Sequence, residues 1–298
     1  MIPAAFDYVR ADDAAAALAQ LDQHGDEAKL LAGGQSLLPL MKLRLAVPSV
    51  VVDVSRAGDL SYVRDEGDTV AVGALTRHSD VAHDDLLRST VPLLAHAAGL
   101  VGDPQVRHRG TIGGSVAHAD PSADLPTALV ALGASYVLTG SAGSRTVEAS
   151  EFGTGFLETV LEPTEMLTEI RVPKPGVSGG SSGGWGYEKF TRRAIDWATV
   201  AVAAARRTDG SVAVALANMG PTVLRANAVE QAGHCLPGPA ISIFPAPVHR
   251  PGSTVREDAG DPTAGDTMSR GVCRGTACSA PLNNSTATRS RTCVRPAR

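Results

Sequence analysis

Cysteine is missing from most of this chain. Residues 1–234 contain none, and the four cysteines of the sequence all lie beyond them. This absence excludes a disulfide, a thiolate nucleophile and cysteine-bound iron–sulfur clusters from the main body of the protein. Cys273 and Cys278 have a C-x4-C spacing, but Pro281 stands where a plant-type ferredoxin needs its next cysteine. We therefore expect no metal site in the C-terminal tail.

The chain also lacks a large excess of positive or negative charge, and it lacks long apolar runs. The net charge of −4 gives no electrostatic basis for binding nucleic acid. The apolar run over residues 198–205 is too short to cross a bilayer. The first residues lack the basic segment and long apolar core of a signal peptide. We expect a cytoplasmic protein with no membrane span and no nucleic-acid partner.

Common motifs for phosphate, dinucleotide and zinc binding are absent as well. The sequence contains no G-x-x-x-x-G-K-[ST], no G-x-G-x-x-G and no H-E-x-x-H. A P-loop, a standard Rossmann dinucleotide site and a zinc protease site are therefore not expected. The eight histidines are scattered along the chain, so they do not suggest a metal site either.

Two glycine-rich segments carry most of the positive information. The first is A-G-G-Q-S at residues 32–36, and the second is T-I-G-G-S at residues 111–115, followed by Asp120 and Asp124. Each segment alone is also compatible with an ordinary strand-to-helix turn or a β-bulge. Glycine permits close backbone approach, and successive N–H groups in such turns form anion-binding concavities. Together the two segments suggest a pyrophosphate held between two loops.

Apolar periodicity predicts a mixture of helices and strands. We expect helices over residues 11–24, 37–45, 92–101 and 126–132, and strands over residues 28–31, 50–54 and 134–139. Hairpins are predicted for residues 60–75 and 197–217. Thr76 and Ser79 are candidate caps for the helix that follows the first hairpin.

Breaker residues and composition suggest the domain organisation. We predict a first domain over residues 1–176, a Gly/Ser linker over 177–184, and a second domain that opens over 185–233. Residues 234–298 contain every cysteine, no lysine and many Pro, Ser, Thr and Arg residues. We expect this tail to be irregular.

The order of three motifs resembles one protein family. The motifs are A-G-G-Q-S, T-I-G-G-S-V-A-H-A-D-P-S-A-D and, near residue 190, Y-E-K-F-T-R-R. Over about residues 1–232 the chain resembles the FAD-binding medium subunits of molybdenum hydroxylases, such as aerobic carbon monoxide dehydrogenase. The resemblance implies an α+β FAD-binding domain of the vanillyl-alcohol-oxidase (PCMH) type in two subdomains. A small C-terminal α+β domain with a three-stranded antiparallel sheet would follow, here apparently incomplete.

The resemblance also implies a set of cofactor-binding residues. Both glycine loops would hold the FAD pyrophosphate, and Asp124 would bond the adenosine ribose. The backbone of Leu167 would face the flavin or adenine, and Lys189 would lie near the isoalloxazine, where its charge favours anionic reduced flavin. The alternative for Lys189 is a solvated strand residue, and the alternative for Tyr187 is core packing. The implied residues are Leu31, Ala32, Gly33, Gly34, Gln35, Ser36, Thr111, Ile112, Gly113, Gly114, Ser115, Asp124, Leu167 and Lys189.

In that family the medium subunit does not bind substrate and has no catalytic side chains. A large molybdenum-cofactor subunit oxidises the substrate, and a small [2Fe–2S] subunit passes electrons to FAD, which delivers them to an external acceptor. A dimer of heterotrimers is the implied assembly. Carbon monoxide is the favoured substrate, with purines, N-heterocycles and aromatic acyl-CoA esters as alternatives. A stand-alone flavin oxidase of the same fold and a scaffold without FAD are the competing classes.

The tail departs from the family, which should continue past Gly233 with further helices. The abrupt change of composition after about residue 233 suggests that a frameshift replaced the native C-terminus. An uninterrupted reading frame on resequencing of the gene would contradict this hypothesis.

Overall fold

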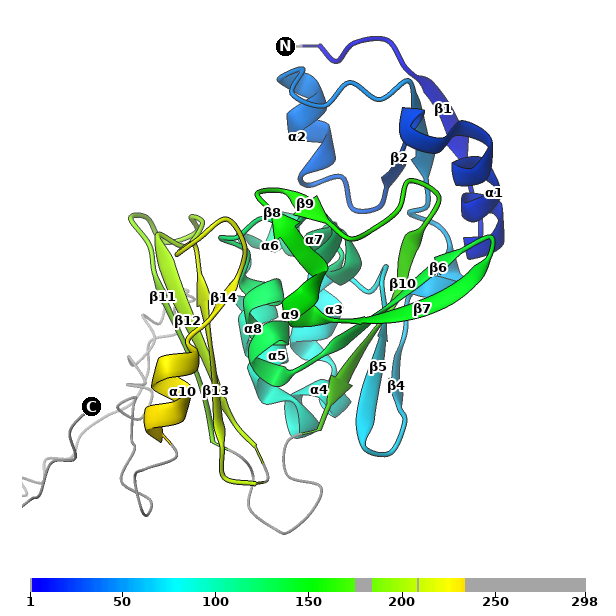
Figure 1. Cartoon of the computed structure of the whole chain (residues 1–298). Coiled ribbons are helices and arrows are strands. Elements are labelled where there is room, and N and C mark those ends of the chain that lie inside the picture. The colour runs from blue at the N-terminus through cyan, green and yellow to red at the C-terminus, as the bar shows by residue number, and fades with distance from the viewer. Residues whose placement is uncertain (1, 175–183, 208, 234–298) are drawn as a thin grey trace, which may run out of the picture. The chain divides into compact units, whose positions relative to one another are not determined.

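The computed structural model of the chain describes residues 2–174, 184–207 and 209–233 (Figure 1). Helices alternate with four sheets in these residues, which confirms the predicted α+β class. The predicted tail over residues 234–298 lies outside the described residues, as does the linker except for Gly184. No helix of the described part is long and apolar enough to cross a membrane.

A three-stranded parallel sheet forms the first subdomain. Its strand order is β1-β3-β2, and β3 pairs in parallel with both neighbours. The elements are β1 (Asp7–Arg10), α1 (Ala14–His24), a 3-10 turn (Gly25–Glu27), β2 (Ala28–Leu31), α2 (Leu37–Lys42) and β3 (Val50–Asp53). The predicted order of strand, glycine segment and helix over residues 28–42 is confirmed.

Local chemistry sets the ends of the two helices in this subdomain. The first begins at Ala14 instead of Ala11, because the Asp13 carboxylate caps it by accepting from the Ala16 N–H at 2.7 Å. Gly25 ends it with φ 51°, as predicted. The second helix ends at Lys42, short of the predicted Leu45, since Arg44 turns to φ 59°.

A five-stranded antiparallel sheet forms the second subdomain. Its order is β4-β5-β10-β6-β7. The strands are β4 (Val63–Asp65), β5 (Thr69–Gly73), β6 (Ser135–Gly140), β7 (Gly143–Glu148) and β10 (Met166–Pro173), with a small hairpin of β8 (Gly153–Gly155) and β9 (Glu158–Thr159). The predicted hairpin over residues 60–75 is confirmed as β4 and β5, and its first strand follows the 3-10 turn Gly58–Leu60. The central strand β10 was not expected.

Seven helices of this subdomain lie between or beside its strands. They are α3 (His78–His83), α4 (Asp85–Thr90), α5 (Pro92–Gly99), α6 (Pro104–Arg107), α7 (Ile112–His118), α8 (Asp124–Leu132) and α9 (Ala149–Phe152). All nine residues of α8 are buried, because it is covered on several sides. The prediction that Thr76 or Ser79 caps α3 was wrong. The helix begins after Arg77, and the Thr76 hydroxyl is bonded to the backbone of Tyr62.

Alanine supplies most of the buried residues in two strands of the C-terminal sheet. Its strands β11 (Trp185–Phe190), β12 (Val200–Arg206), β13 (Val212–Ala217) and β14 (Leu224–Arg225) are antiparallel and are followed by α10 (Asn227–Gly233). The predicted hairpin over residues 197–217 is confirmed. Four strands are present instead of the implied three, because Leu224 and Arg225 pair with β13. Buried alanines such as Ala203 and Ala215 allow α8 to lie close to β12 and β13 (Figure 1).

Two hydrophobic cores support this arrangement. One lies in the first subdomain, where α1 covers β2 and β3. The other includes buried residues of β5, β6, β10, α5 and α8 and continues into β12 and β13. The second subdomain and the C-terminal sheet therefore share one core across the predicted boundary at residue 176.

Candidate functional site

The two glycine-rich segments lie against each other through their backbones. A Cβ atom added to Gly33 would lie 2.7 Å from the Gly110 Cα and would also collide with the Arg109 carbonyl. The Gly114 Cα lies on the same side, since a Cβ there would be 4.0 Å from the Ala32 Cβ. Glycine at position 33 is thus needed for close approach of the first segment to the second.

The first segment offers a run of unused backbone donors. Among the hydrogen bonds of the described residues, none is donated by the N–H groups of Gly33, Gly34, Gln35 or Ser36. The Gln35 side chain bonds the Gly33 carbonyl at 3.3 Å, and Gly34 has φ 75°. Leu31 ends β2 directly before this run, and Ala32 joins the two. Successive free N–H groups at a turn are suited to an anion such as a phosphate.

The second segment is a helix, and its prediction as an N–H-rich loop was wrong. Thr111 is the N-cap of α7, and its hydroxyl accepts from the Gly114 N–H at 3.2 Å. The Ile112, Gly113 and Ser115 N–H groups bond the carbonyls of Thr76, Ala74 and Thr111 at 3.0, 2.8 and 3.0 Å. These four donors are committed inside the protein.

Two polar groups of the second segment stay available. The Thr111 N–H and the Ser115 hydroxyl make no hydrogen bond within the described residues. Gly113 serves packing, since a Cβ there would lie 2.5 Å from the Ala74 Cβ. The second segment therefore contributes a close backbone surface and two donors.

Sequence reasoning missed the segment that supports this helix. Residues 74–78 run antiparallel to the second segment, and Arg77 pairs with Thr111 in an isolated β-bridge. The His78 N–H donates to the Gly110 carbonyl at 2.9 Å. Ala74 also donates to the Thr168 carbonyl at 3.0 Å, which ties the segment to β10. No motif in residues 74–78 signals this role, because it depends on contacts that are distant in sequence.

Asp124 and Lys189 form a buried ion pair. Their side chains are 7% and 10% exposed, and the Lys189 Nζ lies 2.8 Å from the Asp124 Oδ2. The Tyr187 hydroxyl donates to the Asp124 Oδ1 at 2.7 Å, and Lys189 also bonds the Leu100 carbonyl at 3.2 Å. Burial raises the pKa of Asp124, and the hydrogen bonds from Lys189 and Tyr187 offset this only in part. Burial, together with the Asp124 charge, also raises the pKa of Tyr187.

This pairing adds a structural role to the two residues. The resemblance implied that Asp124 bonds the adenosine ribose and that Lys189 lies near the isoalloxazine. Both roles stay predictions, while the contact between the two side chains is observed. The observed contact joins the start of α8 to β11.

Leu167 lies on β10, a strand that packs against α7. It pairs with Leu138 across the sheet, and its side chain is buried in the core. A register shift between Leu167 and Glu169 marks a β-bulge at Thr168. Leu167 therefore directly precedes Thr168, the bulge residue whose carbonyl accepts a hydrogen bond from the Ala74 N–H.

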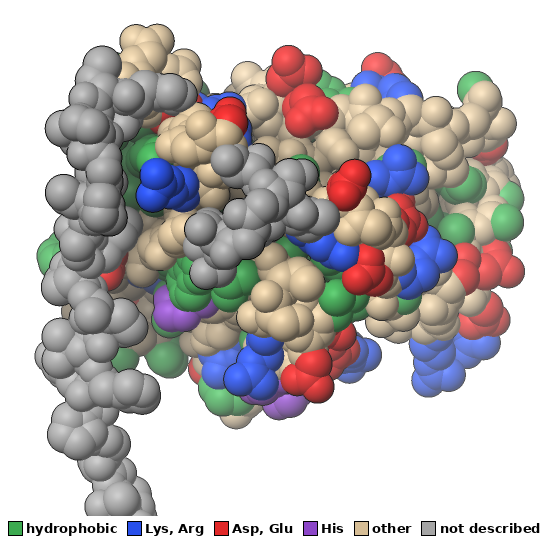
Figure 2. All heavy atoms as spheres, turned by 90° about the horizontal axis from the view of Figure 1, so that it is seen from below, with side chains coloured by type: hydrophobic (Ala, Val, Ile, Leu, Met, Phe, Trp, Pro, Cys, Tyr) green, Lys and Arg blue, Asp and Glu red, His purple; other side chains and the backbone are tan. Residues whose placement is uncertain are grey.

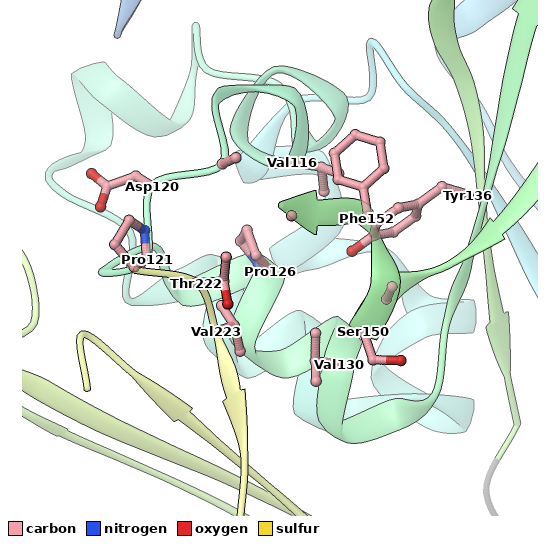
Figure 3. A pocket seen from close by; sticks show the side chains of 13 residues that line it. Val116, Asp120, Pro121, Pro126, Val130, Tyr136, Ser150, Phe152, Thr222 and Val223 are labelled. Atoms are coloured by element: carbon pink, nitrogen blue, oxygen red, sulfur yellow. The ribbon is translucent and has the colours of Figure 1, made fainter. Parts of the chain in front are cut away.

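One cavity of about 40 Å³ lies beside α7 and α8, and no residue of either glycine segment lines it. Its walls are mostly apolar and come from α7, α8, β6, α9 and the segment before β14 (Figure 3). The cavity accommodates a few water molecules and is too small for a dinucleotide. On the face shown in Figure 2, acidic and basic side chains lie interspersed, so charge does not mark a binding surface there. Within the described residues, no group of three or more His, Cys, Asp and Glu side chains could hold a metal.

The glycine segments therefore mark the candidate site, and comparison with known proteins shows the family of the chain. The sequence profile of the FAD binding domain in molybdopterin dehydrogenase matches residues 4–175. The chain belongs to this family. FAD is accordingly its cofactor, and the contact of Gly33 with the second segment, beside four free N–H groups, fits a bound pyrophosphate.

Similarity extends beyond the family's FAD domain. The carbon monoxide dehydrogenase medium chain of Hydrogenophaga pseudoflava is 45% identical over 229 residues, which is 76% of this chain and 78% of that one. The medium chain from Afipia carboxidovorans is 41% identical over 245 residues, 81% of this chain and 83% of that one. The caffeine dehydrogenase subunit beta of a Pseudomonas species is 39% identical, and the match covers 78% of this chain and 79% of that one.

Solved structures agree with this relationship. A carbon monoxide dehydrogenase from Hydrogenophaga pseudoflava has a chain with a TM-score of 0.74 at 46% identity, covering 78% of this chain and 81% of that one. Quinoline 2-oxidoreductase from Pseudomonas putida 86 has a chain with a TM-score of 0.72 at 32% identity, covering 78% and 80%. The chain is thus related to the FAD-binding medium subunits of molybdenum hydroxylases, which are FAD-dependent dehydrogenase subunits.

Proposed function

We propose that this chain carries FAD between the [2Fe–2S] clusters of a partner subunit and an external electron acceptor. The observation that carries the proposal is the backbone contact between Gly33 and residues 109–110, beside the free N–H groups of residues 33–36. These donors suit a pyrophosphate, whose negative charge they stabilise. The Thr111 N–H and the Ser115 hydroxyl would bind the same group from the α7 side.

The protein's part in the reaction is to bind and orient the cofactor. Bound FAD supplies the redox chemistry. Gly33 and Gly34 let the first segment approach the dinucleotide, while Thr111 fixes the first turn of α7. The Asp124–Lys189 pair, with Tyr187, attaches the C-terminal sheet to α8. Leu167 contributes through the position of its backbone beside the bulge in β10.

The partners follow from what the chain lacks and from its relatives. Residues 1–234 contain no cysteine to ligate iron–sulfur clusters, so we place the clusters on another subunit. The relatives from Hydrogenophaga and Afipia are medium chains of carbon monoxide dehydrogenase. We therefore propose a small [2Fe–2S] subunit and a large molybdenum-cofactor subunit as partners, in a dimer of heterotrimers.

Carbon monoxide is the proposed substrate of the complex. Two medium chains of carbon monoxide dehydrogenase, at 45% and 41% identity, support this assignment. The second candidate is an N-heterocycle hydroxylase, since subunits of caffeine dehydrogenase and nicotine 6-hydroxylase are 39% and 36% identical. Assay of the assembled complex with carbon monoxide, caffeine and nicotine separates the two, because selectivity belongs to the large subunit.

The FAD site is tested by a pair of glycine substitutions in the full chain. Gly33→Ala places a Cβ against the backbone of residues 109–110, whereas Gly58→Ala points into open space. We expect Gly33→Ala to weaken FAD binding at least about tenfold in a fluorescence titration, and Gly58→Ala to bind as the wild type does. Equal affinity for the two variants would contradict the proposed site.

A further inference from the structure

His78 is a buried histidine that lies directly behind the glycine site. It begins α3 and is 5% exposed. A Cβ added to Gly110 would lie 2.6 Å from the His78 Cδ2 and 2.7 Å from its Nε2, so the ring packs against the Gly110 backbone. None of the family motifs on which the FAD site was predicted includes this residue.

Gly110 has two close neighbours. Gly33 approaches so closely that its own Cβ would lie 2.7 Å from the Gly110 Cα. Gly110 also packs against the imidazole of His78, which lies where a Cβ of Gly110 would point. The Gly110 backbone therefore contacts both Gly33 and the His78 ring.

The chemistry of the ring points to a steric role. The His78 Nδ1 is buried and has no hydrogen-bond partner within the described residues. Burial, with a further contribution from the Arg107 charge, lowers the pKa of His78 to about 4. The ring is therefore neutral at physiological pH and supplies no charge to a phosphate. A buried nitrogen without a partner destabilises the fold, so no hydrogen bond of Nδ1 holds the ring, whereas the ring does pack against the Gly110 backbone.

We infer that His78 is a positioning residue that holds the Gly110 backbone against Gly33. It thereby sets the distance between the two glycine segments of the FAD site. The inference rests on the proposed FAD site. The backbone bonds beside the ring transmit the effect, since the His78 N–H bonds the Gly110 carbonyl and the Ile112 N–H bonds the Thr76 carbonyl. Without the ring, the Gly110 backbone has room to shift, which loosens its contact with Gly33.

FAD titration of the full chain tests this inference. We expect His78→Ala to raise the Kd for FAD about tenfold. His83→Ala is the matched control, because His83 lies on the same helix and its Nδ1 bonds the Ser79 carbonyl at 2.7 Å, away from the glycine segments. Its Kd should stay that of the wild type. His78→Val, which fills part of the space, should show a smaller change and replaces His78→Ala if that variant does not fold.

A rescue experiment separates positioning from general stability. Gly110→Ala places a methyl group where the His78 ring lies, so FAD affinity should fall. The double variant Gly110→Ala/His78→Ala gives that methyl group room, and its affinity should exceed that of Gly110→Ala. A double variant that binds no better than Gly110→Ala would overturn the inference, as would equal Kd values for folded His78→Ala and His83→Ala.

Amide hydrogen exchange distinguishes failure of this inference from failure of the proposed function. In the free chain, His78→Ala should speed exchange of the Ile112 and Gly113 N–H groups relative to His83→Ala. If the wild type binds no FAD, the proposed site is wrong, and the exchange rates alone decide the role of His78. Unchanged rates at these two amides would then overturn it.

Discussion

Removal of the Asp124 carboxylate should destabilise the protein through Lys189. The Lys189 side chain is 10% exposed and would keep only its 3.2 Å bond to the Leu100 carbonyl. Breaking a buried pair at one partner costs about 3–5 kcal/mol, because an uncompensated charge stays buried. Asp124→Ala should therefore lower the free energy of unfolding by about this amount. Tyr187 would lose its 2.7 Å acceptor in the same variant.

Urea unfolding of the full chain measures this effect, with tryptophan fluorescence as the signal. The two tryptophans, Trp185 and Trp197, both lie in or near the C-terminal sheet, so they report the region that the pair holds. Lys189→Met added to Asp124→Ala should recover part of the loss, since no unpaired charge then stays buried.

An exposed ion pair provides the control for this prediction. Asp85 and Arg88 lie 4.0 Å apart on α4, and both side chains are solvent-exposed. Asp85→Ala should leave the unfolding midpoint close to that of the wild type. If Asp124→Ala were no more destabilising than Asp85→Ala, the pair would not hold the sheet on α8.

Three further predictions concern the surroundings of the site. Thr111→Val removes the cap that bonds the Gly114 N–H and should cost about 1 kcal/mol in urea unfolding. Ala203→Leu overpacks the β12 face against α8 and should cost about 1–3 kcal/mol by the same assay. Burial alone would raise the pKa of Glu169, but hydrogen bonds from Tyr62 and Arg171 outweigh it and lower that pKa. Its stabilisation is complete above the unfolded-state value of about 4.3 and is lost as pH falls through the folded-state pKa. Glu169→Gln should therefore flatten the acid side of the stability–pH curve.

Local signals in the sequence predicted much of the fold. The apolar runs of β2, β3 and β6 and the turn residues between β12 and β13 gave their elements directly. Strand β10 was missed because the bulge at Thr168 breaks its alternation and because Glu169, a charged residue, is buried there. Such a residue is acceptable only because Tyr62, Arg64 and Arg171 bond its carboxylate.

The site was less predictable than the fold. Glycine content favoured a loop at residues 111–115, but the Thr111 cap and the bonds from Ala74 and Thr76 make it a helix. The contact of Asp124 with Lys189 joins residues 65 positions apart, and no local pattern reports such a pairing. Gly33 was predicted as a site residue from its motif, while its close approach to residues 109–110 became visible only in the structure.

The most direct test of the central claim is a visible absorption spectrum of the full chain. The protein is incubated with FAD and desalted, both alone and after co-expression with its large and small subunits. The account predicts that flavin bands stay with the protein and are lost in Gly33→Ala but not in Gly58→Ala. A folded chain that is colourless in both preparations would contradict it.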